Sequence, residues 1–427
     1  MILAVFLISI FTFLFLGIPV AFSILLTVLT MAEASGVTSY EIVPSYLYSG
    51  VNNFALLAIP FFVFCGDLMA AGDLSKGIVD FCRVLLGHVR AGIGYAAILA
   101  CMIFAALTGA AVVTVSAIGG IMLPIMIKEG YDAADSTACV CAGSITGPII
   151  PPSLPMVIFG VLSGASVTRM FIGGVIPGLI TGLVCMLAWY FMNKKKNYAL
   201  SPKATPQEVW AAFKKAFPAL MMPVIMMGGI LTGIFTPTEA GVVACVYAWV
   251  VSTFVYKKMN LKVLKEVSIK SAKSTAVIML IVAACQALAM VITVARIPQA
   301  IAAAISSISS NPLVVMCLIN LFVLIVGLFM DVTPALTILT PIFLPIVTGI
   351  GMDPIVFGVI MVYGLCIGLI TPPVGNVLYI GIGISEITLL DLLKKIWPMV
   401  LLYIAILFLM TVVPGLITFL PNLFAGA

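Results

Sequence analysis

The sequence predicts an all-α polytopic membrane protein with an inverted structural repeat, about ten full spans and two re-entrant helical hairpins. Three observations predict this fold class. Of the 427 residues, 63% are hydrophobic and 8% are charged, whereas a soluble globular chain carries roughly 25% charged residues. The apolar segments recur at the length of about 20 residues that a helix needs to cross a bilayer. Helix-breaking glycines and prolines recur in register between the two halves of the chain.

Ten apolar segments account for the full spans. They do not alternate polar with apolar residues, as the strands of a membrane β-barrel do. The expected spans lie at residues 2–16, 18–36, 52–72, 132–163 and 171–192, then at 217–235, 236–256, 275–295, 353–384 and 396–420.

Two further apolar stretches, 91–131 and 312–352, are each interrupted midway by small, polar or helix-breaking residues. Each stretch could form two full spans or one re-entrant hairpin whose tip stops inside the membrane. Both alternatives return the chain to the side from which it started, so the distribution of charge does not separate them. The fold class stated above takes both stretches as hairpins.

The basic residues predict the orientation in the membrane. With the N-terminus outside, every Lys and Arg except Arg169 and Arg296 falls in a cytoplasmic segment. Such a bias is what the positive-inside rule requires. We therefore expect Lys195 and Lys265 to face the cytoplasm and Arg296 to face the periplasm.

An internal repeat relates the two halves at an offset of 221 residues. Residues 123–177 and 344–398 share 12 identities over 55 positions, and eight of these are Gly or Pro. Recurring breakers are a stronger signal than recurring Leu or Ile, which chance supplies freely in an apolar chain. Each half holds five full spans, an odd number, so the second half is inverted relative to the first. Inverted repeats with interrupted helices are typical of secondary transporters.

The repeat defines the expected domains. The first repeat, residues 1–196, contains two scaffold spans, an arm, the hairpin 91–131 and the broken helix 132–163. Residues 197–216 are the only long polar stretch, and we expect them to form a cytoplasmic linker.

The second repeat, residues 217–427, has the same plan. It contains two scaffold spans, the arm 257–274, the hairpin 312–352 and the broken helix 353–384. The arm is rich in lysine, and we expect it to lie on the inner membrane surface, where anionic lipids attract lysine side chains.

The helix breaks predict binding sites. Non-helical backbone at membrane depth is tolerated only inside protein or beside a watery cavity. The breaks GPIIPPS at 147–153 and GLITPPVGN at 368–376 contain paired prolines, and each proline frees a carbonyl one turn earlier. Such carbonyls, with side-chain oxygens, suit a small alkali cation, and half-helix N-termini suit an anionic substrate. The alternative is that the breakers only kink helices for packing.

We expect two ion half-sites, each made by a hairpin tip and its own broken helix, with a substrate site between them. Asp331 is the one clear charge at membrane depth, which predicts a functional role, although a helix cap is the alternative. Glu239 is either functional or a cap. The substrate is expected to contact Thr108, Ser153 and Asp331. The expected ligands of the alkali cation, which the family resemblance given below implies to be sodium, are Thr108, Gly109, Gly147, Ser153, Asp331, Thr333, Gly368, Thr371 and Asn376.

The composition argues against several other functions. One histidine cannot build a His-based metal site, and one clear intramembrane Asp does not make an aspartyl protease. There is no P-loop, and the basic residues belong to loops, so neither ATP hydrolysis nor nucleic-acid binding is expected. We therefore expect no enzyme and no cofactor besides coupling cations. An ion channel is the alternative to a transporter, since broken helices also build filters.

Four motifs carry a resemblance to a known family: GIFTPTEAG, LTGAAVVTVSAIGGIMLPIM, GYDAADSTACVCAGSITGPIIPPS and DPIVFGVIMVYGLCIGLITPPVGN. Over essentially the whole chain they resemble the large membrane subunit of TRAP transporters, the DctM-type permeases, and among its branches the sialic-acid one (SiaM). The resemblance implies a multi-pass symporter of the bacterial inner membrane with an elevator mechanism. It implies sodium-coupled uptake of an organic acid, such as sialic acid (N-acetylneuraminate), with a C4-dicarboxylate or other carboxylate as the alternative.

The resemblance also implies two protein partners. One is a four-helix small membrane subunit of the DctQ/SiaQ type, expected here as a separate chain, and the other is a soluble periplasmic binding protein. Arg169 and Arg296 are candidate docking residues for the binding protein, with interfacial snorkelling as the alternative. The family commonly shows a serine-rich run at the first hairpin tip. This chain departs from that run with two alanines, at Thr108-Gly109-Ala110-Ala111.

Overall fold

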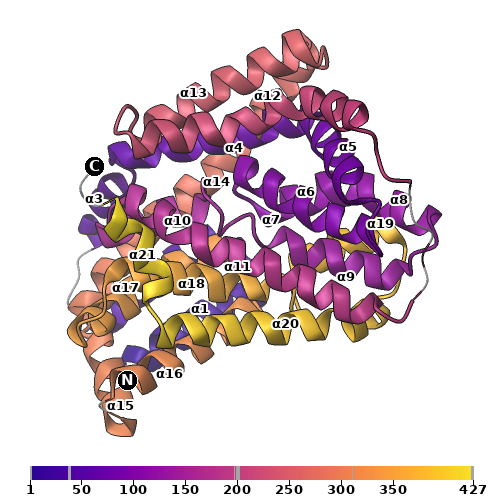
Figure 1. The fold of residues 1–427 in the computed structure, drawn as a ribbon. Helices are drawn as coiled ribbons and strands as arrows, with labels where there is room; N and C mark the ends of the chain where they lie inside the picture. Colours follow the sequence, from indigo (N-terminus) through magenta and orange to yellow (C-terminus); the bar gives the residue numbers. More distant parts are fainter. Residues whose placement is uncertain (1, 37–39, 197, 199–201, 310, 425–427) are drawn as a thin grey trace.

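A computed structural model describes residues 2–36, 40–196, 198, 202–309 and 311–424 of the chain (Figure 1). Every regular element in these residues is a helix, which confirms the all-α class. Eight helices in the described part are long and apolar enough to cross a membrane, in agreement with a multi-pass membrane protein. The helices of the first two expected spans, α1 and α2, have 14 and 16 residues, fewer than the roughly 20 that a crossing usually needs.

The first half of the chain ends with the longest helix of that half, α11. Its elements are α1 (Ile2–Phe15), α2 (Val20–Ser35), η1 (Tyr40–Ile42), α3 (Val43–Val51), η2 (Phe54–Leu57), α4 (Ala58–Ala71), α5 (Leu74–Leu86), α6 (Gly92–Thr108), α7 (Ala111–Thr114), η3 (Val115–Gly119), α8 (Gly120–Lys128), α9 (Ala133–Ser144), α10 (Leu154–Ser163) and α11 (Val167–Asn193).

The second half begins within the expected linker, because α12 starts at a proline that follows the capping residue Thr205. Its elements are α12 (Pro206–Leu231), α13 (Pro237–Val250), η4 (Val251–Val255), α14 (Leu261–Val294), α15 (Ile297–Ile308), α16 (Pro312–Gly327), α17 (Val332–Gly349), α18 (Pro354–Gly368), α19 (Asn376–Ser385), α20 (Leu389–Val412) and α21 (Gly415–Leu423).

The turn that follows each hairpin has the same hydrogen bonds in both halves. The amides of residues 129, 130 and 131 donate to the carbonyls of 125, 127 and 126, and those of 350, 351 and 352 donate to 346, 348 and 347. Gly130 and Gly351 have φ of 86° and 82° in these turns, the left-handed conformation that helix ends use. Asp132 and Asp353 then cap the next helices. The internal repeat is therefore present in the backbone.

The two ambiguous apolar stretches form re-entrant hairpins. In the first, α6 runs to a tip, and α7, η3 and α8 return as one continuous apolar stretch. The tip packs against the break between α9 and α10, which lies near the middle of the expected span 132–163. A tip that meets the middle of a crossing cannot reach the far side of the membrane. The second hairpin, α16 and α17, meets the break between α18 and α19 in the same way.

The two halves pack into each other through their broken helices. α9 contacts α19 and α20, and α10 contacts α17; α9, α11 and α20 lie side by side in the lower part of Figure 1. The buried Tyr403 hydroxyl of α20 donates to the Ala142 carbonyl of α9 over 3.1 Å. Each half-site therefore lies against elements of the other half.

The ion pairs between distant segments collect residues that the sequence predicts to be cytoplasmic. They are Arg83–Glu129 at 3.4 Å, Lys258–Asp73 at 3.8 Å, Lys270–Asp67 at 2.6 Å, Lys395–Asp135 at 3.0 Å and Lys196–Asp135. These contacts agree with the expected orientation, which stays a prediction.

The lysine-rich segment 257–274 is not a separate arm along most of its length. From Leu261 it continues into α14, a single helix of 34 residues. Lys270 and Ser271 both donate to the buried Asp67 of α4, because a buried carboxylate needs such partners. The helices that follow α4 and α14 in the repeat, α5 and α15, are both amphipathic.

Candidate functional site

The first hairpin tip is pressed against its broken helix. α6 ends at Thr108, and Gly109 turns the chain with φ 63° before the extended Ala110. A Cβ atom on Gly109 would lie 2.4 Å from the Pro152 carbonyl oxygen. A Cβ atom on Gly147 would lie 2.9 Å from the Ala110 carbonyl carbon. Both glycines are therefore required for the close approach of the tip to the break. Their role as ion ligands stays a prediction.

Buried hydroxyl groups surround this contact. The Thr108 hydroxyl donates to the Phe104 carbonyl and lies 3.3 Å from the Thr114 hydroxyl. The Ser153 hydroxyl donates to the Pro148 carbonyl and accepts from the Met156 amide over 3.3 Å, which caps α10. Thr114 was not among the expected ligands. Its signal in the sequence is its position in the first turn after the tip, where a side chain can return toward Thr108.

The second hairpin tip closes on its broken helix by backbone contacts. The Val374 amide donates to the Leu328 carbonyl over 3.2 Å. A Cβ atom on Gly368 would lie 2.1 Å from the Gly327 carbonyl oxygen, so the two glycines lie directly against each other. Gly368 is thus part of the contact, as expected, while Gly327, Leu328 and Val374 were not anticipated. Each Pro–Pro bond in the two breaks, 151–152 and 372–373, is cis.

The other expected ligands of the second half-site lie around this contact. The Asp331 side chain is exposed and accepts from the Val332 amide over 2.8 Å, so it caps α17. Thr333 is half-buried, and Asn376, also half-buried, is the first residue of α19. The buried Thr371 hydroxyl donates to the Ile367 carbonyl over 2.7 Å. In the repeat, Asp331 occupies the position that Ala110 holds in the first tip.

Helix starts at the two tips and breaks differ in their caps. Side chains cap α10 and α17, but α7 and α19 begin without a side-chain cap. An uncapped helix start can offer amide groups to an anionic group. At α19 the Val377 and Leu378 amides already donate to the Leu369 and Gly375 carbonyls, so the start of α7 has more amides to offer. The described residues contain no cluster of three His, Cys, Asp or Glu side chains. The arrangement therefore offers carbonyl and hydroxyl oxygens to a hard cation and amide donors to a carboxylate.

Glu239 is a helix cap. Its carboxylate accepts from the Thr236 amide over 2.8 Å, and its own amide donates to the Thr236 hydroxyl over 3.3 Å. This reciprocal pair is a capping box at the start of α13. The motif GIFTPTEAG therefore has a structural role at this carboxylate.

The two candidate docking arginines have different surroundings. Arg296 is exposed and precedes α15, whereas Arg169 is half-buried in the first turn of α11. The Arg169 Nε atom is buried without a hydrogen-bond partner among the described residues. Of the two, Arg296 is the more accessible to a partner protein.

Comparisons with known proteins find similarity along most of the chain. The family model described as "Tripartite ATP-independent periplasmic transporter, DctM component" matches residues 7–416. A relative from Escherichia coli strain K12, the 2,3-diketo-L-gulonate TRAP transporter large permease protein YiaN, is 40% identical over 94% of this chain and 95% of its own. The sialic acid TRAP transporter large permease protein SiaM of Vibrio cholerae is 35% identical over 97% of each chain.

Two further matches bear on the architecture. The isethionate TRAP transporter permease protein DctMQ of Oleidesulfovibrio alaskensis is 36% identical over 97% of this chain, which spans 65% of that relative. The crystal structure of the Alcanivorax borkumensis YdaH transporter is similar in fold, with a TM-score of 0.58, 14% identity and 86% of each chain covered. Since relatives of similar identity are named for different substrates, the sialic-acid branch has no specific support.

Proposed function

Because the chain belongs to the DctM family of tripartite ATP-independent periplasmic transporters, we propose that it moves an organic acid across the bacterial inner membrane together with sodium. The family and its relatives are named as transporter permeases, so the chain is a permease and not an enzyme. The observation that carries the proposal is the closure of two hairpin tips on two broken helices at one repeat offset. Discontinuous helices form the substrate and ion sites of secondary transporters.

Sodium would bind at each closed tip. In the first half its ligands would be backbone carbonyls of the tip and the break, with the hydroxyls of Thr108 and Ser153 and that of the newly identified Thr114. In the second half Asp331 would offer a full negative charge close to the tip. Its cap on α17 is compatible with this role, because a carboxylate has a second oxygen that can face a cation. The remaining proposed ligands are Gly109, Gly147, Thr333, Gly368, Thr371 and Asn376.

The substrate carboxylate would bind between the half-sites, near the uncapped starts of α7 and α19. Thr108, Ser153 and Asp331 are the proposed polar side chains around it. Bound sodium would make this region more positive, which would favour an anion and so couple the two solutes. We propose the substrate only as a chemical class, the organic acids. Sialic acid is one candidate, beside the diketogulonate and isethionate for which relatives are named.

An elevator movement would carry the two half-sites across the membrane together. The hairpins and broken helices of the two halves pack into each other, which supports their movement as one transport domain. The expected partners are a small four-helix membrane subunit and a periplasmic binding protein. The relative named DctMQ is longer than this chain, so a small subunit on a separate chain is itself part of the proposal.

Uptake by reconstituted protein tests this function. The permease would be placed in proteoliposomes with its small subunit and binding protein, and labelled sialic acid, 2,3-diketo-L-gulonate and a C4-dicarboxylate would be offered. We expect one acid to accumulate above its external concentration only when a sodium gradient points inward. Equal accumulation with potassium in place of sodium would contradict sodium coupling. Flux that only equalises concentrations would indicate a channel.

Labelling of single cysteines tests the orientation on which inward transport depends. We expect cysteines placed at Lys195 and Lys265 to react with an impermeant reagent only from the cytoplasmic side. A cysteine at Arg296 should react only from the periplasmic side. Reaction of positions 195 and 296 from the same side would overturn the inverted arrangement.

A further inference from the structure

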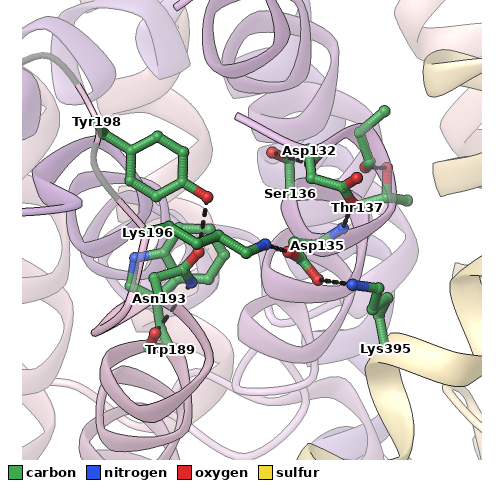
Figure 2. Close-up of polar contacts among 10 residues, drawn as sticks. Asp132, Asp135, Ser136, Thr137, Trp189, Asn193, Lys196, Tyr198 and Lys395 are labelled. Carbon is green, nitrogen blue, oxygen red and sulfur yellow. Dashed lines mark hydrogen bonds and ion pairs between the residues drawn. The ribbon is translucent and has the colours of Figure 1, made fainter. Parts of the chain in front are cut away.

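Three consecutive lysines follow α11, and the last of them turns inward. The Lys196 ammonium contacts the carboxylate of Asp135, a residue whose side chain is 2% exposed (Figure 2). Lys395 of α20 contacts the other carboxylate oxygen of Asp135 over 3.0 Å. The buried carboxylate thus joins the end of α11 to α9 and α20. The sequence interpretation did not single out Asp135.

The ion pair between Lys196 and Asp135 holds the backbone at the end of α11 against α9. Burial is the largest single effect on the pKa of the Lys196 ammonium group and lowers it, but the hydrogen bond to Asp135 and the attraction of the Asp135 charge together raise this pKa above its ordinary value. The Lys196 carbonyl accepts from the Arg90 guanidinium over 3.2 Å. The side-chain amide of Asn193 donates through its nitrogen to the Trp189 carbonyl and accepts through its oxygen from the Tyr198 hydroxyl, as Figure 2 shows. The residues on both sides of Lys194 and Lys195 are therefore held by bonds to other segments.

The other two lysines, Lys194 and Lys195, line a cavity of about 420 Å³. In the described part of the chain, neither has a carboxylate within ion-pair distance. The Lys194 ammonium instead lies 5.3 Å from the centre of the Phe191 ring. Arg90, Tyr95, Tyr190 and Asn193 complete the polar lining, and no Asp or Glu of the described residues lines the cavity. Its polar side chains thus present positive charges and hydroxyl groups, which favour an anion.

An exposed apolar stripe leads along α11 to this cavity. Leu179, Leu183 and Leu187 are spaced by four residues, so they lie on one face of the helix. They are 48%, 61% and 51% exposed, and Tyr190 follows at the edge of the cavity with 50% exposure. A ligand that fills the cavity and covers the stripe must have an anionic end and a long apolar part.

We propose that this cavity binds the headgroup of an anionic phospholipid, with the acyl chains lying along the Leu179–Leu187 face of α11. The lysines lie at the end predicted to be cytoplasmic, where anionic lipids attract basic residues. Basic pockets between transmembrane helices bind such headgroups through the phosphate. A free phosphate would use the same cations, but it would leave the apolar stripe uncovered.

A second lysine pair at the same end of the molecule provides a matched control. Lys214 and Lys215 are also consecutive, and the Lys214 ammonium lies 5.5 Å from the centre of the Trp210 ring. Their cavity of about 550 Å³, however, also contains Asp73 and Asp80. Lys76 and Lys258 line it too, so the two carboxylates cancel half of its four positive charges, and Asp73 is paired with Lys258 over 3.8 Å. With acidic side chains in its wall, this second cavity should select an anionic lipid less than the first cavity does.

Native mass spectrometry of the purified full-length protein in detergent can test the proposal. The probes are phosphatidylglycerol, phosphatidylcholine with the same acyl chains, and inorganic phosphate. We expect wild-type protein to retain phosphatidylglycerol in preference to the other two. The double variant Lys194→Gln/Lys195→Gln should bind phosphatidylglycerol roughly 30-fold more weakly, about fivefold for each lysine. The control variant Lys214→Gln/Lys215→Gln should bind it as the wild type does.

Three outcomes would overturn the proposal. These are equal retention of phosphatidylglycerol by the wild type and the Lys194/Lys195 variant, an equal loss in the Lys214/Lys215 control, or binding of inorganic phosphate as strong as that of the lipid. The single variant Tyr190→Phe alters the cavity but keeps all charges, and it should weaken the binding of phosphatidylglycerol only a few-fold. Binding retained in this variant would show that a change in the cavity wall does not by itself misfold the protein. The measurement needs no transport, so its failure leaves the proposed function untouched.

Discussion

The two half-sites share a backbone design and differ in their side chains. In each, a hairpin tip contacts the break of its own helix so closely that glycine is required. The first tip is surrounded by the buried hydroxyls of Thr108, Thr114 and Ser153 and has no charge. In the repeat, the positions of Thr108 and Thr114 become Phe329 and Ala335, and that of Ala110 becomes Asp331.

The difference teaches that the repeat preserves shape rather than ligand chemistry. Carbonyl groups are available at both breaks, because helix interruption frees them whatever the side chains are. The first half adds neutral hydroxyls, and the second adds one carboxylate. Two sodium sites built in this way should differ in affinity and in their response to substitution.

Removal of the carboxylate should have the largest effect. We expect Asp331→Ala to lose about 3 kcal/mol of sodium affinity, roughly 100-fold, so that sodium-driven uptake disappears while the protein stays folded. Asp331→Asn separates the two roles of this side chain, because an amide can still cap α17 but carries no charge. Uptake titrated against sodium in proteoliposomes measures both variants. Normal sodium dependence in Asp331→Ala would mean that the carboxylate is only a cap.

Of the repeat-related glycines in the two breaks, Gly368 should tolerate substitution less than Gly147. A Cβ atom on Gly368 meets backbone at 2.1 Å, and one on Gly147 meets backbone at 2.9 Å. Backbone cannot move aside as a flexible side chain does, so we expect Gly368→Ala to cost about 2–3 kcal/mol and Gly147→Ala about 1 kcal/mol less. Thermal unfolding in detergent compares them.

A matched control for these glycine variants is Gly349→Ala, where nothing lies within 4 Å of the added methyl group. It should leave the unfolding temperature unchanged or raise it slightly, because alanine favours helix. Equal unfolding temperatures for Gly368→Ala and Gly349→Ala would contradict the close contact between Gly327 and Gly368.

Loss of a hydroxyl in the first half should have a moderate effect. We expect Thr108→Val and Thr114→Val each to weaken sodium binding about tenfold, the equivalent of roughly 1.4 kcal/mol for a lost ligand oxygen. Thr348→Val is the control, since its hydroxyl also bonds to its own helix, at 2.9 Å from the Leu344 carbonyl, but is exposed. If all three variants keep wild-type sodium affinity, the first tip holds sodium without side chains.

The smallest effect is expected at Arg296, the exposed arginine before α15. Arg296→Glu should weaken coupling to the binding protein a few-fold without changing expression, because exposed charges act mainly on the rate of encounter. Lys265→Glu, on the side predicted to be cytoplasmic, is the control. Uptake measured over a range of binding-protein concentrations should shift for Arg296→Glu alone. Identical curves for both variants would indicate that Arg296 serves only to anchor the chain at the interface.

Many of the tip contacts could be predicted from the sequence, because a glycine or a proline interrupts a helix through its own backbone. Gly109, Gly147 and Gly368 were expected at the breaks, and all three make the tip contacts. Thr114 and Asp135 were missed. Their roles depend on what lies opposite them, a hydroxyl across a turn for Thr114 and lysines of two other helices for Asp135. Sequence spacing alone does not indicate such partners.

The sequence by itself determined the membrane class, the repeat and the places where helices break. Those features follow from apolar segment length, charge bias and the missing amide of proline, which are properties of single segments. Only the tertiary structure decided that the two apolar stretches are re-entrant, since that depends on a tip meeting the middle of another crossing. It also decided that Asp331 caps α17 and that Asp67 is paired with α14. Burial and pairing of a carboxylate are set by neighbours far away in the chain, and those neighbours exist only once the helices have packed.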